Sequence, residues 1–445
     1  MTTRQKVAGR MIFQAHKKKF SYHAKYFSNK TMDPDRLLKG SQVFCLAPWS
    51  HIHVVPTGKV YPCCMSAHLE QNAIGDLRLG DTLESSWNSP KMRDLRKSML
   101  NGQPSACCER CYIPEKNNLS SFRRGINFKM ASHFDKVGRT DADGGLDVFR
   151  VPYLDIRFSN RCNFRCRTCC PDLSSGWRAD AVKLGWIDGS SSSEIRAAEA
   201  GGPFMTRIFS LIDDAESVFF AGGEPLLMDE HYQILNRLIA RKKWRVRLAY
   251  NTNCSVLQYK QYDLLKMWKR FKDILILASL DGSHKRGDYI RKGQDWAAIE
   301  GNIAAIRKKC PQALLRLAPT VSVFNAFHLT GFFQELIDKR LFKMYEINVN
   351  ILFEPAMYNI RNFPPRLKEK LTRQYEDFIN EYLPSGRSAE TAREHFQAVI
   401  RYMNGGILQC LGEFRQVTRQ LDELRNENFC EVFPEIRELL DEADG

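Results

Sequence analysis

A repeated alternation of strand-like and helix-like segments runs from residue 150 to residue 355. Short apolar runs rich in β-branched residues alternate there with stretches whose apolar residues recur every three or four positions, a pattern typical of successive βα units. The expected strands are 154–158, 218–221, 246–250, 274–280, 317–323 and 347–353. The pattern predicts an α/β fold built on a partial (β/α)6 barrel, in which ligands gather at the carboxyl ends of the strands.

The length of 445 residues is too great for one ordinary core. An alternating segment at 50–55 faces a second one at 59–62 across a turn, which predicts a hairpin ahead of the barrel. Beyond residue 360 the pattern is helical. We predict a basic N-terminal arm, a small α+β domain, a linker, the barrel and a helical C-terminal region at 1–40, 41–115, 116–149, 150–355 and 356–445.

Charge and hydropathy limit where in the cell the protein is expected and which partners it is expected to bind. No apolar run is long enough to span a bilayer, and the basic N-terminal stretch lacks the apolar core of a secretion signal. We therefore expect a cytoplasmic protein without a membrane partner. The net charge of +15 attracts anionic partners, but no recognisable nucleic-acid-binding motif accompanies it, so composition does not favour nucleic acid.

Cysteine is concentrated in two short stretches. Of the fourteen cysteines, six fall between Cys45 and Cys111 and four between Cys162 and Cys170. In a chain without a secretion signal, such grouping points to metal sites and away from disulfides. The remaining four are expected to be small buried hydrophobic residues: Cys254, Cys310, Cys410 and Cys430.

The later group, Cys162-Asn-Phe-Arg-Cys166-Arg-Thr-Cys169, follows the first expected barrel strand. Three thiolates can hold three irons of a 4Fe-4S cluster and leave the fourth iron open to a ligand. A zinc site is the competing interpretation, because Cys170 could supply a fourth ligand.

Short polar motifs follow the next three strands. They are Gly-Gly-Glu-Pro at 222–225, Asn-Thr-Asn at 251–253 and Ser-Leu-Asp-Gly at 279–282, with Arg291 a little further on. Glycine permits close backbone approach to a ligand, and an arginine can grip a carboxylate through its two-pronged guanidinium. Each motif alone is weak, because each could be a simple turn.

The CxxxCxxC motif, with these motifs in this order, resembles the radical S-adenosylmethionine (SAM) superfamily over residues 150–355. The resemblance implies that Cys162, Cys166 and Cys169 hold a 4Fe-4S cluster whose open iron binds SAM. It also implies that SAM is cleaved reductively to a 5′-deoxyadenosyl radical, with electrons from a flavodoxin- or ferredoxin-type donor. The implied SAM-binding residues are Gly222, Gly223, Glu224, Pro225, Asn251, Asn253, Ser279, Asp281 and Arg291.

Among these, the resemblance assigns the 222–225 motif to the methionine amino group of SAM, Ser279 and Asp281 to its ribose, and Arg291 to its carboxylate. The chain departs from many relatives at Thr168, where an aromatic residue usually precedes the third cysteine. The contact affected is the one between this position and the adenine of SAM, because Thr168 has no aromatic ring to pack on it.

The earlier cysteine group contains Cys45, a Gly-x4-Cys ending at Cys63, and Cys108-Glu-Arg-Cys111. Spacing alone leaves a structural zinc held by four cysteines as a competitor. The hairpin-then-helix context resembles instead the twitch and SPASM modules that hold an auxiliary 4Fe-4S cluster, here placed before the barrel. Cys64 and Cys107 are adjacent alternatives to Cys63 and Cys108.

Two histidines, His51 and His53, alternate with apolar residues on the first arm of the hairpin. We expect them on the exposed face of this strand and not among the metal ligands.

The expected function is hydrogen abstraction from a substrate by radical SAM chemistry, with a peptide or protein as the favoured substrate. One alternative is oxidation of a carbohydrate or cyclitol-like small molecule by the same chemistry. Another is a zinc-stabilised nucleic-acid-binding protein. Catalytic residues beyond the cluster and SAM site, the group that quenches the substrate radical and the oligomeric state do not follow from the sequence.

Overall fold

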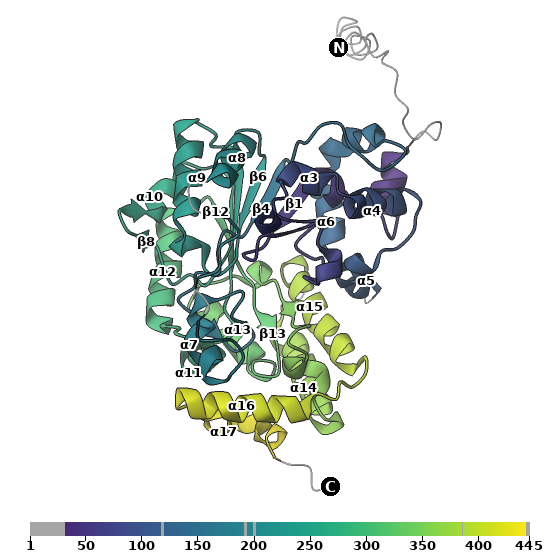
Figure 1. The fold of residues 1–445 in the computed structure, drawn as a ribbon. Coiled ribbons are helices and arrows are strands. Elements are labelled where there is room, and N and C mark those ends of the chain that lie inside the picture. The colour runs from purple at the N-terminus through teal and green to yellow at the C-terminus, as the bar shows by residue number, and fades with distance from the viewer. Residues whose placement is uncertain (1–31, 117–119, 191–193, 199–201, 385, 442–445) are drawn as a thin grey trace, which may run out of the picture.

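The computed structural model describes residues 32–116, 120–190, 194–198, 202–384 and 386–441. Most of the predicted basic arm, 1–40, therefore lies outside the described residues. The central feature is a sheet of eight strands: β1 (His51–Val54), β2 (Lys59–Tyr61), β3 (Gly75–Asp76), β4 (Tyr153–Ile156), β6 (Ser217–Phe220), β7 (Arg247–Thr252), β10 (Ile274–Ala278) and β12 (Ala313–Leu317). Their order is β12-β10-β7-β6-β4-β1-β2-β3 (Figure 1).

Six of the eight strands, from β12 across to β1, run parallel to their neighbours. Parallel neighbours need crossover connections, and helices supply most of them. The helices between β4 and β12 are α7 (Arg178–Lys183), α8 (Pro203–Ile212), α9 (Asp229–Ala240), α10 (Leu264–Trp268), α11 (His284–Ile290) and α12 (Trp296–Lys309). The mixed α/β fold with a largely parallel sheet is confirmed.

The last two predicted strands differ from those observed. Instead of one strand at 317–323, the chain forms β12 and then β13 (Thr320–Val321), which pairs in parallel with β14 (Asn350–Ile351) in a separate small sheet. Pro319 lies between β12 and β13, and a proline has no N–H to donate to a neighbouring strand. Only a single bridge, Leu317 to Ile347, continues the main sheet toward β14 among the described residues.

The predicted hairpin at 50–62 is confirmed, because β1 and β2 pair antiparallel. The sheet also crosses the predicted boundary at 116–149, since β1 pairs in parallel with β4 and covers what would otherwise be an exposed sheet edge. Residues 116–149 are not a bare linker. They form α6 (Phe122–Lys129) and a 3-10 helix (Ala131–Arg139), whose apolar residues Ile126 and Val137 are buried.

The prediction that His51 and His53 are exposed is wrong. Both are fully buried, because β1 lies inside the sheet between β4 and β2. The alternation in sequence correctly indicated a strand. It could not reveal that both faces of this strand are covered.

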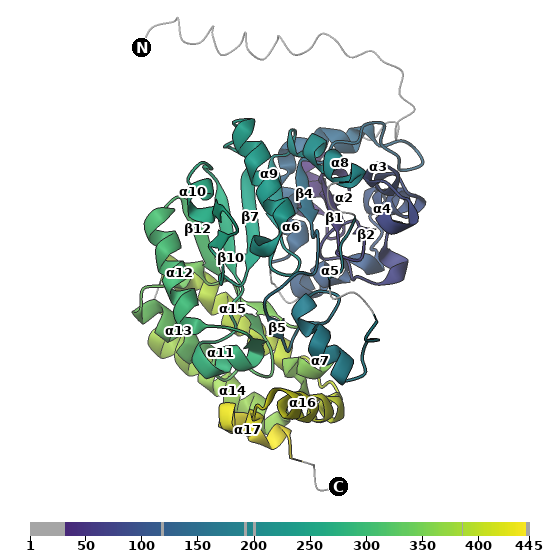
Figure 2. The ribbon, with the colours of Figure 1, turned by 60° about the vertical axis from the view of Figure 1, so that its left-hand side comes forward.

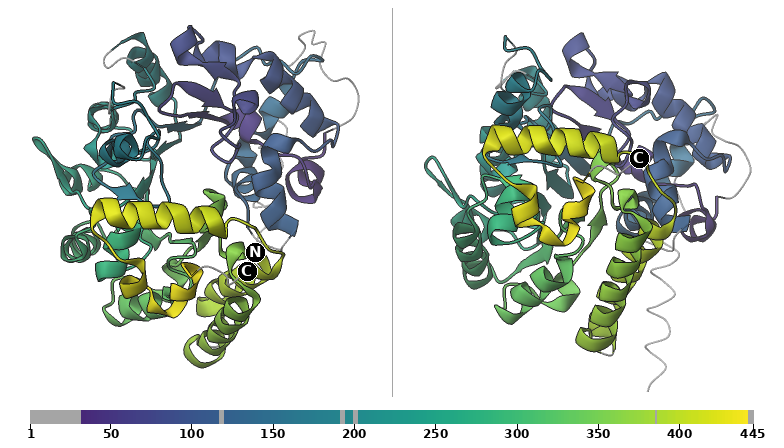
Figure 3. Two further views of the ribbon diagram at one scale, coloured as in Figure 1. Left: turned by 60° about the horizontal axis from the view of Figure 1, so that its bottom comes forward. Right: turned by 90° about the horizontal axis from the view of Figure 1, so that it is seen from below.

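The remaining helices complete the two ends of the fold. The N-terminal segment adds α2 (Ala47–Ser50), α3 (Leu83–Trp87), α4 (Pro90–Leu100) and α5 (Glu109–Lys116), and the C-terminal segment adds α13 (Leu329–Asp338), α14 (Pro365–Asp377), α15 (Arg387–Asn404), α16 (Leu411–Arg425) and α17 (Phe429–Val432). Figures 2 and 3 show α16 lying across the end of the molecule that carries α7 and α11. No helix in the described part of the chain has the length and apolar character needed to cross a bilayer.

Candidate functional site

The loop that leaves the carboxyl end of β4 carries Cys162, Cys166 and Cys169. Within it, the amide of Cys169 donates to the carbonyl of Cys166 at 3.0 Å. Burial, and next the neighbouring Cys166, raises the pKa of the Cys162 thiol to about 12. Burial followed by Cys166 also raises the pKa of Cys169 well above its ordinary value. Because the loop is poorly solvated, these three thiols deprotonate readily only when they bind a metal. The donor set therefore fits an iron-sulfur cluster.

The Gly-Gly-Glu-Pro loop after β6 packs directly on the cysteine loop. Gly222 has a φ of +123°, a conformation that side chains other than glycine's strain to adopt. A Cβ on Gly223 would lie 2.2 Å from the carbonyl oxygen of Arg161, the residue before Cys162. The two loops approach this closely because neither glycine has a side chain.

Glu224 is buried and joins this loop to the end of β7. Its carboxylate accepts from the Thr252 hydroxyl and the Asn253 amide, both at 2.8 Å, and from the Leu226 amide at 3.1 Å. Burial raises the pKa of Glu224 from 4.5 to about 7 and outweighs these donors. Because the folded protein keeps this proton to higher pH than the unfolded chain, the stabilising contribution is full below about pH 4.5 and is lost as pH rises through about 7.

Asp281 and Arg291 bind each other across the site. Nε of Arg291 donates to Oδ2 of Asp281 at 2.8 Å, and Oδ1 of Asp281 accepts from the Thr320 amide at 2.8 Å. Burial works against the charge of Arg291, but Asp281 and then Cys166 raise its pKa above the usual value. The family resemblance assigned Asp281 to the ribose of SAM and Arg291 to its carboxylate. In the structure the carboxylate of Asp281 binds Arg291 itself.

Arg291 is also fixed next to the thiols through its backbone. It belongs to β11 (Arg291–Lys292), which pairs antiparallel with β5 (Arg165–Cys166), and Arg291 faces Cys166 in the register. This pairing brings the Asp281–Arg291 ion pair to the cysteine loop.

Of the other residues expected at the SAM site, only Asn253 has a hydrogen bond to the cysteine loop among the described residues. Nδ2 of Asn253 donates to Oδ1 of Asn163, inside the cysteine motif, at 3.0 Å. The amide of Ser279 donates to the carbonyl of Thr252 at 2.8 Å. Pro225 begins a 3-10 helix, whereas the Asn251 side chain is exposed.

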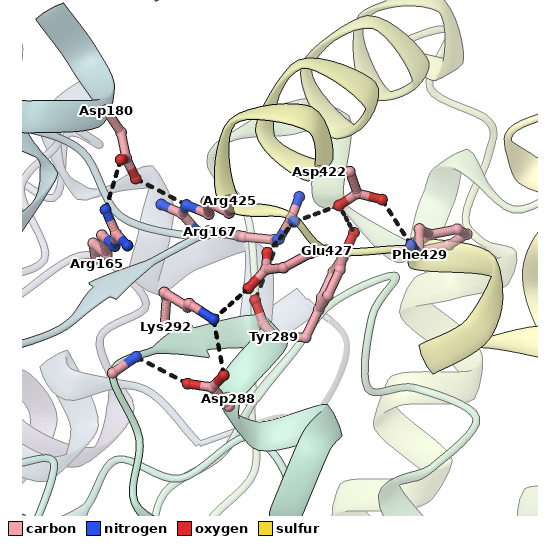
Figure 4. Close-up of polar contacts among 11 residues, drawn as sticks. Arg165, Arg167, Asp180, Asp288, Tyr289, Lys292, Asp422, Arg425, Glu427 and Phe429 are labelled. Atoms are coloured by element: carbon pink, nitrogen blue, oxygen red, sulfur yellow. Dashed lines mark hydrogen bonds and ion pairs between the residues drawn. The ribbon is translucent and has the colours of Figure 1, made fainter. Parts of the chain in front are cut away.

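A buried ion network that the sequence did not reveal ties the C-terminal segment to the cysteine loop (Figure 4). Arg167, next to Cys166, contacts Asp422 of α16 at 2.5 Å and Glu427 at 2.6 Å, and its side chain is 0% exposed. Asp422 also accepts from the Tyr289 hydroxyl at 2.7 Å. On the other side of Cys166, Arg165 shares Asp180 of α7 with another C-terminal residue, Arg425. The network fixes the residues on both sides of Cys166.

We predict that Arg167→Leu destabilises the protein by about 3 kcal/mol, because it leaves Asp422 and Glu427 with a buried charge and one counterion fewer. Urea unfolding followed by circular dichroism measures the effect. The control is Arg373→Leu, which removes an exposed pair with Glu369 and should cost less than about 1 kcal/mol. Equal effects of the two substitutions would contradict a stabilising role for the network.

The earlier cysteine group also comes together. Cys45 precedes α2, Cys63 follows β2, and Cys111 lies on α5, which begins directly after Cys108. Burial, and next Cys111, raises the pKa of Cys63 to about 12. Burial, and next Cys63, raises the pKa of Cys45 well above its ordinary value. These thiols therefore share one poorly solvated site with the chemistry needed for a metal cluster.

Two side chains of α6 hold the segment that carries Cys45. Arg123 donates to the carbonyl of Phe44 at 2.8 Å and forms a buried ion pair with Glu115 on α5. Oδ1 of Asn127 accepts from the Leu46 amide at 2.8 Å. The predicted linker thus positions the first cysteine of the group relative to the last.

The two members of the first adjacent cysteine pair have different neighbours. Cys63 lies near Cys111 and Cys107, whereas Cys64 lies with His51 and Asp155 but also near Cys63 and Cys111. Cys107 and Cys108 remain together, with their sulfurs 3.7 Å apart; both lie near Cys63, and Cys108 also lies near Cys45.

Comparison with known proteins found a family model that covers the earlier cysteine group and two curated relatives of part of the chain. A model of the SPASM family, described as an iron-sulfur cluster-binding domain, matches residues 45–112. A GTP 3′,8-cyclase of Campylobacter lari is 30% identical over 114 residues, which are 26% of this chain and 31% of that protein. A GTP 3′,8-cyclase of Aliarcobacter butzleri is 30% identical over 125 residues, or 28% and 32% of the two chains.

These similarities support the resemblance to radical SAM proteins with a SPASM-type domain and to their 4Fe-4S and SAM cofactors. The chain spans about a third of the length of the curated cyclases that it matches.

Solved structures with a partial likeness include native anSMEcpe with bound AdoMet and a Kp18Cys peptide. That structure is 17% identical with a TM-score of 0.35 over 50% of this chain and 59% of the other. TYW1 with a lysine-pyruvate adduct is 12% identical with a TM-score of 0.31 over 50% and 70%.

Proposed function

We propose that the protein is a radical SAM enzyme that modifies a peptide or protein by abstracting hydrogen from it. Cys162, Cys166 and Cys169 would hold the cluster that binds SAM, and Cys45, Cys63, Cys108 and Cys111 the auxiliary one. When bound and reduced, the first cluster supplies the electron that cleaves SAM. We place this chemistry in a partial barrel of six βα units that β13 and β14 complete.

The observation that carries the proposal is the gathering of three separate segments around one cysteine loop. Gly223 packs on Arg161, Asn253 bonds Asn163, and Arg291 pairs with Cys166. These contacts join segments that lie up to about 130 residues apart, and each segment had been singled out for SAM binding. A set of unrelated turns has no reason to converge on a thiol triad.

The side chains at this loop have distinct tasks in the proposal. Gly222 and Gly223 let the backbone approach the methionine part of SAM, and Glu224 orients the end of β7 through its bonds to Thr252 and Asn253. Asp281 holds the Arg291 guanidinium in one orientation, which leaves the rest of its donors for the SAM carboxylate.

We predict that Arg291→Ala weakens SAM binding by about 10- to 100-fold, the range for a lost charge-assisted hydrogen bond. Arg291→Lys should fall between wild type and Ala, because it keeps the charge but not the planar fork. Anaerobic calorimetric titration of SAM into the cluster-loaded protein measures the three affinities. Equal affinities would remove Arg291 from the SAM site.

The preference for a peptide or protein over a small metabolite rests on analogy with twitch and SPASM relatives, whose substrates include peptides as well as small carbohydrates and cyclitols. The proposed setting is the cytoplasm, where thiols stay reduced, and the proposed reductant is a flavodoxin- or ferredoxin-type donor.

Deuterium transfer tests the activity and the substrate class together. A deuterated extract of the producing cells would first be split by ultrafiltration into a macromolecular and a small-molecule fraction. The cluster-loaded protein would then be incubated with SAM, a reductant and one fraction at a time. We expect deuterium in 5′-deoxyadenosine only with the macromolecular fraction. Deuterium from the small-molecule fraction alone would refute the peptide assignment, and a complete lack of 5′-deoxyadenosine would refute the activity.

A further inference from the structure

A third group of metal-binding side chains lies beside the auxiliary cysteines. It consists of His51, Cys64 and Asp155, and one ligand atom of each lies within 4.8 Å of those of the other two. His51 is on β1, Cys64 follows β2 and Asp155 is on β4, so the group spans three neighbouring strands of the sheet.

The imidazole of His51 is prepared to act as a ligand. The ring is fully buried, and Nδ1 lies 3.2 Å from the carbonyl oxygen of Tyr153. A carbonyl can only accept, so Nδ1 carries the proton and Nε2 presents a lone pair. Nε2 is buried and has no hydrogen-bond partner among the described residues. Metal-binding histidines typically donate their other N–H to such a carbonyl, which fixes the ring.

The carboxylate of Asp155 is short of partners. The residue is 0% exposed, and within the described part of the chain neither oxygen has an aligned hydrogen-bond donor. The nearest side-chain N–H groups are Nδ1 of His53, 3.1 Å from Oδ2, and Nε of Arg157, 3.8 Å from Oδ1. A buried carboxylate with so few bonds is costly, and a divalent cation would offset that cost.

We propose that Nε2 of His51, Sγ of Cys64 and a carboxylate oxygen of Asp155 bind one divalent zinc-type ion. A mixed nitrogen, sulfur and oxygen set suits zinc, and one thiolate with one carboxylate balances its charge. The single thiolate sets this site apart from the two iron-sulfur sites. The ion links β4, β1 and β2, and so joins the SPASM-type domain to the barrel strands.

X-ray absorption at the zinc edge tests the site in the wild-type protein. Both clusters would first be reconstituted anaerobically, zinc added, and unbound metal removed by gel filtration. We expect about one zinc per chain, with one sulfur and the remaining ligands nitrogen or oxygen. Four sulfur ligands would place zinc in a cysteine set and overturn the proposal, as would the loss of all zinc on the column.

Variants supply a second test that does not depend on activity. His51→Gln and Cys64→Ser should each weaken zinc binding by at least about 10-fold and leave cluster iron at the wild-type level. Cys430→Ser, at a half-buried thiol near the C-terminus, is the matched control and should change neither value. If Cys64→Ser instead loses about four irons per chain, Cys64 is a ligand of the auxiliary cluster and the proposal is wrong.

Discussion

Replacing Cys162, Cys166 and Cys169 together by alanine should abolish the formation of 5′-deoxyadenosine and remove about four irons per chain. SAM is cleaved only when it is bound to the open iron of a cluster, and these three thiols are the ligands that the cysteine loop offers. Quantitative iron and sulfide analysis and mass spectrometry of the nucleoside products measure both effects.

The matched control is Cys170→Ala, which removes the neighbouring thiol outside the CxxxCxxC spacing. This variant should keep the iron content and the SAM cleavage of the wild type. Undiminished cleavage in the triple variant would refute the assignment of the cluster. Loss of cleavage in the Cys170 variant would show that the ligand set was chosen wrongly.

The second large effect is expected at the auxiliary site. Cys108→Ala combined with Cys111→Ala should also remove about four irons per chain, because half of the four thiolates are lost. SAM cleavage without substrate should persist, since it needs only the cluster proposed at Cys162, Cys166 and Cys169, whereas formation of modified product should fall sharply. Iron analysis and the ratio of 5′-deoxyadenosine to product report the two outcomes separately.

Cys310→Ser is the control for this variant, because Cys310 is buried at the end of α12, outside both cysteine groups. It should leave iron and product unchanged. A double variant that keeps its iron and loses zinc would mean that the auxiliary site is structural. Aggregation of the double variant can be separated from cluster loss by testing Cys111→Ser alone, a change of similar size at the position that lies in the α-helix α5.

Local patterns fixed much of the candidate site. The CxxxCxxC motif is only eight residues long, so its three thiols lie on one short segment whatever the rest of the chain does. The alternation of strand and helix patterns likewise located β4, β6, β7 and β10 to within a few residues. Both signals depend only on neighbours along the chain.

Contacts between distant residues did not follow from those patterns. The family resemblance assigned Asp281 to the ribose of SAM and Arg291 to its carboxylate. In the structure the two side chains bind each other, because β11 folds back onto β5. His51 and His53 were expected at the surface, since the sequence shows one strand but not the neighbours that cover it. Arg167 and Asp422 carried no signal at all, because 255 residues separate them.

The sequence by itself determined the two cysteine groups and the order of the βα units. The radical SAM chemistry to be tested is what their resemblance to that superfamily implies. Only the tertiary structure decided that Cys64 lies with His51 and Asp155 as well as near Cys63, and that one sheet joins the SPASM-type segment to the parallel strands β4 to β12. The physical reason is that spacing along the chain limits which ligands can share a loop. The direction in which each side chain points depends on the strands that pack beside it.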